Sequence, residues 1–332
     1  MLKMKTVGVN GFGRIGRCFT RIALQDPQIE VALVNDLADV KTLAHLLKYD
    51  SIHGLFSLSF EIEGSTLVFE NGKKLVFMSE RNPELINWSA AGVEVVIEAT
   101  GLFLTREAAE KHLVGGAKHV VISAPANDDD IPSVVLGVND DQIDWTTTLI
   151  SNASCTTNNA APMVKVLKEV LDIEVAYIST IHSYTSDQRL HDSPHKDLRR
   201  ARAAANSIIP TSTGAAKAIT RIFPDLQGKI TGGSFRVPVS DGSVTEMTLV
   251  TNSAVTADQI NAAMKAAAAG PLKGILQYTE DPIVSVDVLG NPHSVVFDAG
   301  LTTVFNGLIK VAGWYDNEAG YSNRLVDVVK RF

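Results

Sequence analysis

The sequence predicts an α/β protein, with a doubly wound, mainly parallel sheet in its first half and an α+β domain with a mainly antiparallel sheet in its second. In the first half, short β-branched runs alternate with helical patterns, as the crossover connections of parallel strands require. In the second half, strand-like runs follow one another with few helices between them, which is typical of antiparallel pairing. The length of 332 residues fits about two domains.

The first half is expected to alternate strands and helices. The expected strands, which are short and rich in β-branched residues, are 6–10, 30–35, 93–98 and 119–123. The expected helices, which carry apolar residues at helical spacing, are 14–25, 40–48 and 105–113. Segments 56–62 and 66–78 are predicted to form an antiparallel excursion, with a turn at Glu70-Asn71-Gly72.

The second half is expected to open with a helix at 155–171, a strand at 174–182 and a long polar stretch at 183–206. A helix near 213–223 and another at 257–269 interrupt the later strand-like runs, which are 233–238, 243–250, 295–297, 301–305 and 308–315. We place the domain boundary near Ser151, so that residues 1–151 and 152–316 form the two domains. On pattern alone, the last helix at 317–330 fits either domain.

Composition excludes several classes of protein. With 30 Lys and Arg against 37 Asp and Glu, the net charge is −7, which argues against a dedicated nucleic-acid partner bound through phosphate contacts. Two cysteines can form neither a disulfide framework nor a four-thiolate zinc site, and no metal is expected. No stretch reads as a signal peptide or a membrane span, so we expect a cytoplasmic protein without a membrane partner.

A glycine motif predicts a dinucleotide site of the Rossmann type. Gly11, Gly13 and Gly16 form G-x-G-x-x-G between an expected strand and an expected helix, which is the context in which this motif indicates dinucleotide binding. Asp36 follows the next strand, 20 residues after Gly16, where a carboxylate binds the adenosine ribose and repels a 2′-phosphate. NAD is therefore favoured over NADP. The alternative is a glycine turn beside a capping aspartate.

Cys155 is the candidate nucleophile. It begins an expected helix within Ser-Asn-Ala-Ser-Cys-Thr-Thr-Asn, where backbone N–H groups and the helix dipole favour a thiolate. His182 ends the next expected strand and is the candidate base. The alternatives are a small buried cysteine and a merely exposed histidine at a strand end. Cys18, which lies inside the first helix, is expected to serve packing.

Basic and hydroxyl side chains gather after His182, in a chain that is acidic as a whole. They are Thr185, Arg189, Lys196, Arg199, Arg200, Arg202, Thr211, Ser212, Thr213, Gly214 and Arg236. Such a cluster favours an acidic, phosphorylated substrate. A solvated loop or a subunit contact is the alternative for most of these residues.

Together these segments resemble the phosphorylating glyceraldehyde-3-phosphate dehydrogenases of the bacterial, NAD-preferring type. The resemblance runs from Lys5 to Arg331 and rests on VGVNGFGRIGR at 7–17, KYDSIHG at 48–54, SNASCTTN at 151–158, HSYTSDQRLHDSPHKDLRRARAAA at 182–205, IIPTSTGAAKA at 208–218, FRVPV at 235–239 and WYDNEAGYSNR at 314–324. It implies a Rossmann-type NAD-binding domain completed by the C-terminal helix, here 317–332, and a catalytic domain at 152–316.

The resemblance also implies roles for individual residues. Cys155 would be the nucleophile and His182 its base. The implied NAD contacts, besides the glycines, are Arg14, Ile15, Asp36, Arg81, Ser123 and Asn317, the last for the nicotinamide carboxamide. Thr185 and Arg236 would hold the substrate's phosphate. The implied site for inorganic phosphate comprises Ser154, Thr156, Thr213, Gly214 and one arginine of the RRAR run, for which we choose Arg199 over Arg200 and Arg202.

The implied activity is oxidation of D-glyceraldehyde 3-phosphate to 1,3-bisphosphoglycerate, through a thiohemiacetal and a thioester on the cysteine, by a homotetramer in glycolysis or gluconeogenesis. Erythrose-4-phosphate dehydrogenase remains an alternative, and a non-catalytic NAD- or RNA-binding regulator is a more distant one. The chain departs from the common family pattern at Asn159 and Ala160, where many members carry Cys-Leu, and in the segment 239–249. Leu37 and Pro194 resemble the NAD-preferring members.

Overall fold

The computed structural model describes residues 4–332, which divide into two compact units. The first unit holds the described chain up to Val134 together with Asp141–Ala153 and Ser322–Phe332. The second holds Val135–Asp140 and Ser154–Tyr321. Within residues 4–332, no helix is long and apolar enough to cross a membrane.

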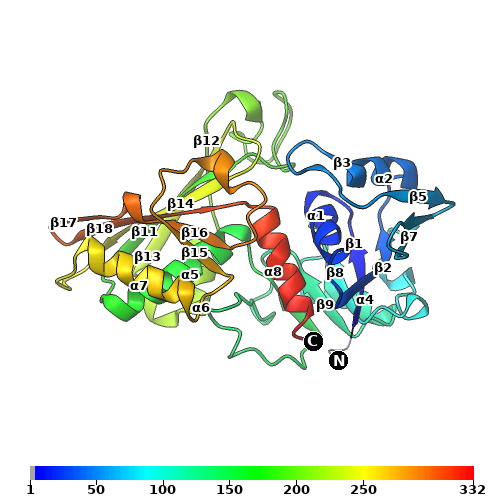
Figure 1. The fold of residues 1–332 in the computed structure, drawn as a ribbon, viewed down its shortest axis with the longest axis horizontal. Helices are drawn as coiled ribbons and strands as arrows, with labels where there is room; N and C mark the ends of the chain where they lie inside the picture. Colours follow the sequence, from blue (N-terminus) through cyan, green and yellow to red (C-terminus); the bar gives the residue numbers. More distant parts are fainter. Residues whose placement is uncertain (1–3) are drawn as a thin grey trace. The chain divides into compact units, whose positions relative to one another are not determined.

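The first unit is built on an eight-stranded sheet in the order β10-β9-β8-β1-β2-β7-β6-β5 (Figure 1). The six strands from β10 to β7 run parallel, and β6 and β5 extend them as an antiparallel hairpin. The parallel part has the strand order of a Rossmann fold, with the switch point between β1 and β8. The predicted doubly wound sheet is confirmed, and the turn at Gly72 closes the connection from β6 to β7.

The predicted strands and helices of the first unit are present, although the strand expected at 56–62 begins only at Phe60 and the expected helix at 105–113 is interrupted. At Glu110, hydrogen bonds of the i to i+3 type replace the α-helical pattern and divide it into α3 and α4. The short strands at 49–50, 54–55 and 149–151 were not predicted. The elements are β1 (Lys5–Asn10), α1 (Arg14–Ala23), β2 (Ile29–Asn35), α2 (Val40–Lys48), β3 (Tyr49–Asp50), β4 (Gly54–Leu55), β5 (Phe60–Glu63), β6 (Thr66–Phe69), β7 (Lys74–Met78), β8 (Val95–Glu98), α3 (Arg106–Ala109), α4 (Lys111–Val114), β9 (His119–Ile122) and β10 (Leu149–Ser151).

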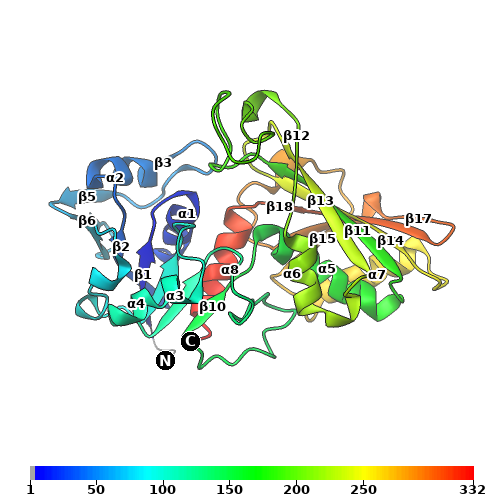
Figure 2. The ribbon, with the colours of Figure 1, turned by 180° about the vertical axis from the view of Figure 1, so that it is seen from behind.

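The second unit has a mixed, mainly antiparallel sheet in the order β12-β13-β11-β14-β18-β16-β15, with β17 paired to β18. Only β11·β13 and β15·β16 are parallel. Helices α5, α6 and α7 lie along one face of this sheet (Figures 1 and 2). Their apolar side chains, such as Met163, Ile219 and Met264, form one core with Ile178 and Met247 of the strands. The predicted α+β architecture is confirmed.

The bounds in the second unit match the prediction closely, and 243–250, 257–269 and 308–315 agree at both ends. Strands β12 and β15 were not predicted, because both are short. The elements are α5 (Cys155–Val170), β11 (Val175–Ser183), β12 (Ile209–Thr211), α6 (Ala215–Ile222), β13 (Ile230–Val237), β14 (Ser243–Val250), α7 (Ala257–Ala269), β15 (Leu276–Thr279), β16 (Val295–Asp298), β17 (Thr303–Phe305), β18 (Leu308–Tyr315) and α8 (Ala319–Val329), which continues into the first unit.

Candidate active site

Cys155 is the first residue of α5, and the residues before it shape the start of that helix. Ala153 adopts a left-handed conformation with φ of 53°, which is costly for a residue with a Cβ and is often found at functional sites. Ser154 caps the helix, and its Oγ accepts a hydrogen bond from the Thr157 backbone N–H at 3.0 Å. The thiol therefore lies at the positive end of a 16-residue helix.

His182 lies next to this thiol. It is the penultimate residue of β11, and its Nε2 is 3.4 Å from Cys155 Sγ. Arg236 of β13 pairs directly with His182 in the parallel β11·β13 register, so the guanidinium reaches the far side of the imidazole. Its Nη1 is 2.9 Å from His182 Nδ1. The structure thus brings the three predicted residues together within the second unit.

The hydrogen bonds around His182 determine which nitrogen carries the proton. Nδ1 lies 2.7 Å from the Ser183 carbonyl oxygen, to which Arg236 Nη1 also donates at 3.0 Å. A guanidinium can only donate, so Nδ1 cannot both donate to Ser183 and accept from Arg236. The shorter contact favours a proton on Nδ1, donated to Ser183. Nε2 then presents its lone pair to the Cys155 thiol, as a general base requires.

Burial sets the electrostatics of this pair. Although Cys155 keeps some exposed surface, the surrounding protein desolvates its thiol and raises its pKa, while the Arg236 charge and hydrogen bonds from Thr156 act in the opposite direction. Burial and then the Arg236 charge lower the pKa of His182 to about 3. The imidazole is therefore neutral and can accept the thiol proton, which couples thiolate formation to proton transfer.

Tyr315 is part of this site, although no role was predicted for it from the sequence. It ends β18 and is almost fully buried, with its ring edge-on to His182 at 6.0 Å between centroids. Its hydroxyl lies 3.0 Å from Thr156 Oγ1. The Thr156 hydroxyl, predicted to contact inorganic phosphate, is thus engaged with Tyr315. Burial raises the pKa of Tyr315, which keeps its proton available for hydrogen bonding.

The predicted site for the substrate phosphate is formed by residues beside His182. Arg236 Nη1 lies 3.5 Å from Thr185 Oγ1. The Thr185 backbone N–H donates to Gln188 Oε1 at 3.3 Å, which holds the chain after β11 in a turn. Thr213 and Gly214 lie at the start of α6, where Thr213 Oγ1 accepts the Ala215 N–H at 3.2 Å.

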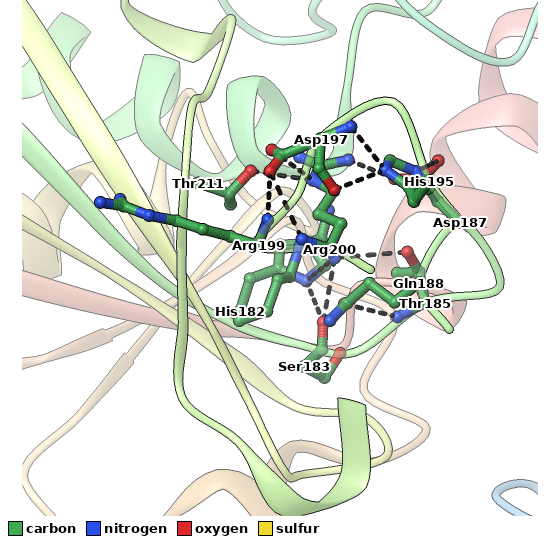
Figure 3. Close-up of polar contacts among 11 residues, drawn as sticks. His182, Ser183, Thr185, Asp187, Gln188, His195, Asp197, Arg199, Arg200 and Thr211 are labelled. Atoms are coloured by element: carbon green, nitrogen blue, oxygen red, sulfur yellow. Dashed lines mark hydrogen bonds and ion pairs between the residues drawn. The ribbon is translucent and has the colours of Figure 1, made fainter. Parts of the chain in front are cut away.

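Two neighbouring arginines of the RRAR run face different surroundings (Figure 3). Arg200 Nε donates to Thr211 Oγ1 at 2.8 Å, its Nη1 pairs with Asp187, and its charge lowers the pKa of both His182 and Arg236. The Arg199 side chain points away from His182 and Thr185. Arg199 instead lines an open hollow of about 550 Å³ with Tyr177 and Phe235. Of these two arginines, Arg200 is therefore the one whose charge acts on His182 and Arg236.

The glycine motif lines a hollow of about 380 Å³ in the first unit. Gly11, Gly13, Asp36 and Arg81 all border it. Gly11 has φ of +93°, and a Cβ there would lie 2.8 Å from the Thr100 backbone nitrogen, whereas the space beside Gly13 is open. This cradle at the start of α1 fits the pyrophosphate of NAD. Other residues of its wall were not predicted from the sequence, and these are Asn10, Asn35, Glu80, Ala99, Thr100, Leu102 and Phe103.

The remaining predicted NAD contacts of the first unit lie on α1 and at strand ends. The Asp36 carboxylate is already oriented, because Oδ2 accepts the Phe12 N–H at 2.7 Å and Oδ1 accepts the Ala38 N–H at 3.0 Å. Arg14 donates to Asp50 at 2.6 Å. Ile15 is half-buried on the first turn of α1, and Gly16 packs against Gly11 O. Ser123 follows β9, where its N–H donates to Glu98 O.

Asn317 lies in the second unit, two residues after β18. Its side-chain oxygen accepts hydrogen bonds from Ser183 Oγ at 2.8 Å and from Ser243 Oγ at 2.7 Å. Ser243 belongs to the segment 239–249, which differs from the common family pattern. Within this segment, Gly242 packs against the Ser285 backbone, and a Cβ at Gly242 would lie 2.2 Å from Ser285 O. The other departure also has a structural role, because Asn159 Nδ2 donates to Gly313 O at 3.2 Å and to Trp314 O at 3.3 Å.

Two family models match the chain. "Glyceraldehyde 3-phosphate dehydrogenase, NAD binding domain" matches residues 5–106, and "Glyceraldehyde 3-phosphate dehydrogenase, C-terminal domain" matches residues 154–317. Among curated proteins, the chain is 53% identical to glyceraldehyde-3-phosphate dehydrogenase 1 of Bacillus subtilis over 324 residues, which cover 97% of this chain and 96% of that one. It is 54% identical to the Geobacillus stearothermophilus enzyme over 324 residues, with the same coverage, and 53% identical to that of Mycobacterium tuberculosis over 329 residues, 97% of each.

Proposed function

The chain belongs to the glyceraldehyde-3-phosphate dehydrogenase family, and from this premise we propose that it oxidises D-glyceraldehyde 3-phosphate with NAD and inorganic phosphate to 1,3-bisphosphoglycerate. The observation that carries the proposal is the 3.4 Å contact between Cys155 Sγ and a neutral His182 Nε2. An aldehyde carbon cannot release hydride until a nucleophile has made it tetrahedral, and this pair supplies both the nucleophile and its base.

The first step is addition of the Cys155 sulfur to the aldehyde carbon while His182 Nε2 takes the thiol proton. The product is a thiohemiacetal, whose developing oxyanion is stabilised by the Cys155 backbone N–H and by the imidazolium. The Ser183 carbonyl accepts from Nδ1–H of His182 and so supports the positive charge that the ring acquires. Arg236 and Thr185 hold the phosphate of the substrate and place its aldehyde carbon against the sulfur.

NAD would supply the hydride acceptor when bound. The residues proposed to hold it are Gly11, Gly13, Gly16, Arg14, Ile15, Asp36, Arg81, Ser123 and Asn317. The imidazolium first returns its proton to the oxyanion, which gives the hydroxyl of the thiohemiacetal. The neutral His182 then takes that hydroxyl proton as the carbon loses its hydride, and a thioester on Cys155 results. Inorganic phosphate then attacks the thioester carbonyl, the carbon–sulfur bond breaks, and His182 returns a proton to the sulfur. The acyl phosphate product keeps the free energy that hydrolysis of the thioester would release.

For inorganic phosphate we favour Arg200 over Arg199, together with Ser154, Thr156, Thr213 and Gly214. The support is that the Arg200 charge acts on His182 and Arg236, whereas the Arg199 side chain points away from His182 and lines the open hollow beside Tyr177. Because these arginines are adjacent, Arg199→Gln is a matched control for Arg200→Gln. We expect Arg200→Gln to raise the KM for inorganic phosphate at least tenfold, with Arg199→Gln close to the parent. A larger rise in the KM for inorganic phosphate in Arg199→Gln than in Arg200→Gln would instead assign phosphate binding to Arg199.

The proposed reaction is tested by NADH formation from two aldehydes, each with and without phosphate. D-Glyceraldehyde 3-phosphate should be preferred and its oxidation should need phosphate, whereas efficient, phosphate-independent oxidation of erythrose 4-phosphate would favour the alternative enzyme. Cys155→Ser should abolish turnover while leaving NAD affinity within about twofold. Substantial residual turnover would exclude Cys155 as the nucleophile, and an active parent enzyme excludes a purely regulatory NAD-binding protein.

We further propose a homotetramer. The second unit exposes three large apolar side chains that line the Arg199 hollow, namely Tyr177, Leu198 and Phe235, and exposed apolar patches of this kind commonly mark subunit interfaces. Light scattering coupled to size exclusion should give four times the monomer mass of 35.7 kDa. Replacement of Leu198 and Phe235 by Asp should reduce that mass, and a monomeric parent would refute the proposal.

A further inference from the structure

Three strand ends meet around the side chain of Asn317. Ser183 is the last residue of β11, Ser243 is the first residue of β14, and Asn317 follows the last residue of β18 by two positions. Because β14 is antiparallel to both β11 and β18, its beginning lies beside their ends. The sheet therefore brings together three polar residues that are 134 and 74 positions apart in the sequence.

The hydrogen bonds at this junction define the orientation of the Asn317 amide. Ser183 and Ser243 are fully buried, so the hydrogen of each hydroxyl needs an acceptor. Ser243 Oγ already accepts the Ser183 backbone N–H at 3.1 Å. In residues 4–332, Asn317 Oδ1 is the acceptor available to both hydroxyls, at 2.8 Å and 2.7 Å. Rotating the amide by 180° would leave two buried hydroxyl hydrogens without an acceptor. Each unpaired hydroxyl would lower the equilibrium population of the rotated amide several-fold.

The consequence concerns the other end of the same side chain. With Oδ1 turned towards the serines, Asn317 Nδ2 carries two N–H donors in the opposite direction, and it makes no hydrogen bond within the described chain. We infer that Ser183 and Ser243 are positioning residues, which hold the Asn317 amide with its N–H groups ready to donate to the carbonyl oxygen of the cofactor carboxamide. This inference rests on the proposed function, which assigns the carboxamide to Asn317.

Ser183 links this junction to the catalytic base. Its backbone carbonyl accepts from His182 Nδ1, and its hydroxyl donates to Asn317 Oδ1. A single residue at the end of β11 thus orients the imidazole and the amide. The hydroxyl can be removed without changing the backbone carbonyl, so the two roles can be separated by experiment.

Ser183→Ala is the sharper test, because its hydroxyl has one hydrogen bond, whereas Ser243→Ala would also leave the Ser183 N–H without its acceptor. We expect Ser183→Ala to weaken NAD binding about threefold to tenfold, measured by calorimetry. Affinity for ADP-ribose, which lacks the nicotinamide ring, should stay within about twofold. Ser183→Thr, which keeps the hydroxyl, should restore NAD affinity. The matched control is Ser179→Ala, on the same strand and remote from Asn317.

The outcomes separate this inference from the proposed function. If Asn317→Ala weakens NAD binding and Ser183→Ala does not, the serines do not position the amide and the inference fails alone. If neither variant changes NAD affinity, Asn317 does not contact the carboxamide and that part of the proposed function fails as well. Equal losses for NAD and ADP-ribose in Ser183→Ala would indicate a general structural role and would overturn the inference. Should Ser183→Ala not fold, Ser243→Ala and Ser243→Thr provide the same comparison.

Discussion

His112 offers a stringent test of the buried hydrogen-bond network in the first unit. Its imidazole is fully buried between Trp88 and Glu98, with Nδ1 at 3.1 Å from Trp88 Nε1 and Nε2 at 2.9 Å from Glu98 Oε2. An indole N–H only donates, so Nδ1 must accept and the proton lies on Nε2, from which it is donated to Glu98. The same carboxyl group accepts from Asn10 Nδ2 at 2.6 Å and from the Thr100 N–H at 2.8 Å.

We expect His112→Leu to destabilise the protein by about 3–5 kcal/mol. The variant removes a hydrogen bond to a buried carboxylate, typically about 1.5–3 kcal/mol, and leaves the Trp88 N–H without an acceptor, typically about 1–3 kcal/mol. For a unit of this size, the loss corresponds to a fall in Tm of roughly 6–20 °C. His112→Gln keeps an N–H donor for Glu98 and an oxygen acceptor for Trp88, and it should lose less than half as much.

The network also borders the cofactor hollow through Asn10 and Thr100. His112→Leu should therefore weaken the binding of NAD and ADP-ribose alike, unlike the Ser183 variant. Thermal unfolding followed by tryptophan fluorescence, combined with calorimetric titration of both ligands, measures the two effects. Equal Tm values for the Leu and Gln variants would refute the hydrogen-bond argument, since packing alone would then account for the role of His112.

Four further predictions concern other sites. Arg236→Ala should shift the pH profile of Cys155 alkylation by iodoacetamide to higher pH, because the Arg236 charge lowers the pKa of the thiol; Arg236→Lys should retain most of the parent profile. Burial opposes ionisation of Asp50, yet hydrogen bonds from Arg14 and from two backbone N–H groups lower its pKa to about 2. The contribution of this ionised group to stability is complete above pH ~4 and is lost as pH falls through about 2. Asp50→Asn should therefore reduce the pH dependence of the free energy of unfolding in that window. Asp36→Ala should raise the ratio of kcat/KM for NADP to that for NAD at least tenfold, because it removes the charge that repels a 2′-phosphate; an unchanged ratio would show that Asp36 does not select the cofactor. Asn159→Ala should lower stability by about 1–3 kcal/mol in thermal unfolding, because buried carbonyls of Gly313 and Trp314 lose their donor; the alkylation rate of Cys155 serves as the control.

Much of the first unit could be predicted from sequence because its signals are local. A strand, a glycine turn and a helix follow one another within 6–25, and Asp36 directly follows the next strand. Cys155 was also accessible, since the helix that begins at this residue and its capping serine are adjacent in the sequence. Local patterns could not show which of Arg199 and Arg200 faces the site, because the backbone conformation of an irregular loop sets the directions of neighbouring side chains, and the sequence pattern does not predict that conformation.

Other site residues were hidden because only the sheet brings them together. Tyr315 reaches Thr156 across 159 positions, and it reads in the sequence as one more apolar residue at the end of a strand. Ser183 and Ser243 are small polar residues at strand ends, where serine is unremarkable. His112 lies in the segment 105–113, for which only a helix was predicted, and its contacts are with Trp88 and Glu98 on other segments. The pairing of strands that are distant in the sequence therefore places these residues together, and hydrophobic periodicity does not determine that pairing.

The charge balance of the second unit explains how an acidic chain can favour an anionic substrate. Arg236 Nη1 donates to the Ser183 carbonyl and lies 3.5 Å from the Thr185 hydroxyl and 2.9 Å from His182 Nδ1, and within the described chain Arg236 forms no ion pair. Arg200 lies close enough to lower the pKa of Arg236, after burial, and Arg200 itself pairs with Asp187 and, at 3.8 Å, with Asp197. Arg236 thus lies near a second guanidinium group and a neutral histidine, without an ion pair of its own in the described chain. A phosphate dianion would remove this repulsion, so the cost of burying Arg236 is recovered when substrate binds, and the net charge of −7 describes the surface and not the site.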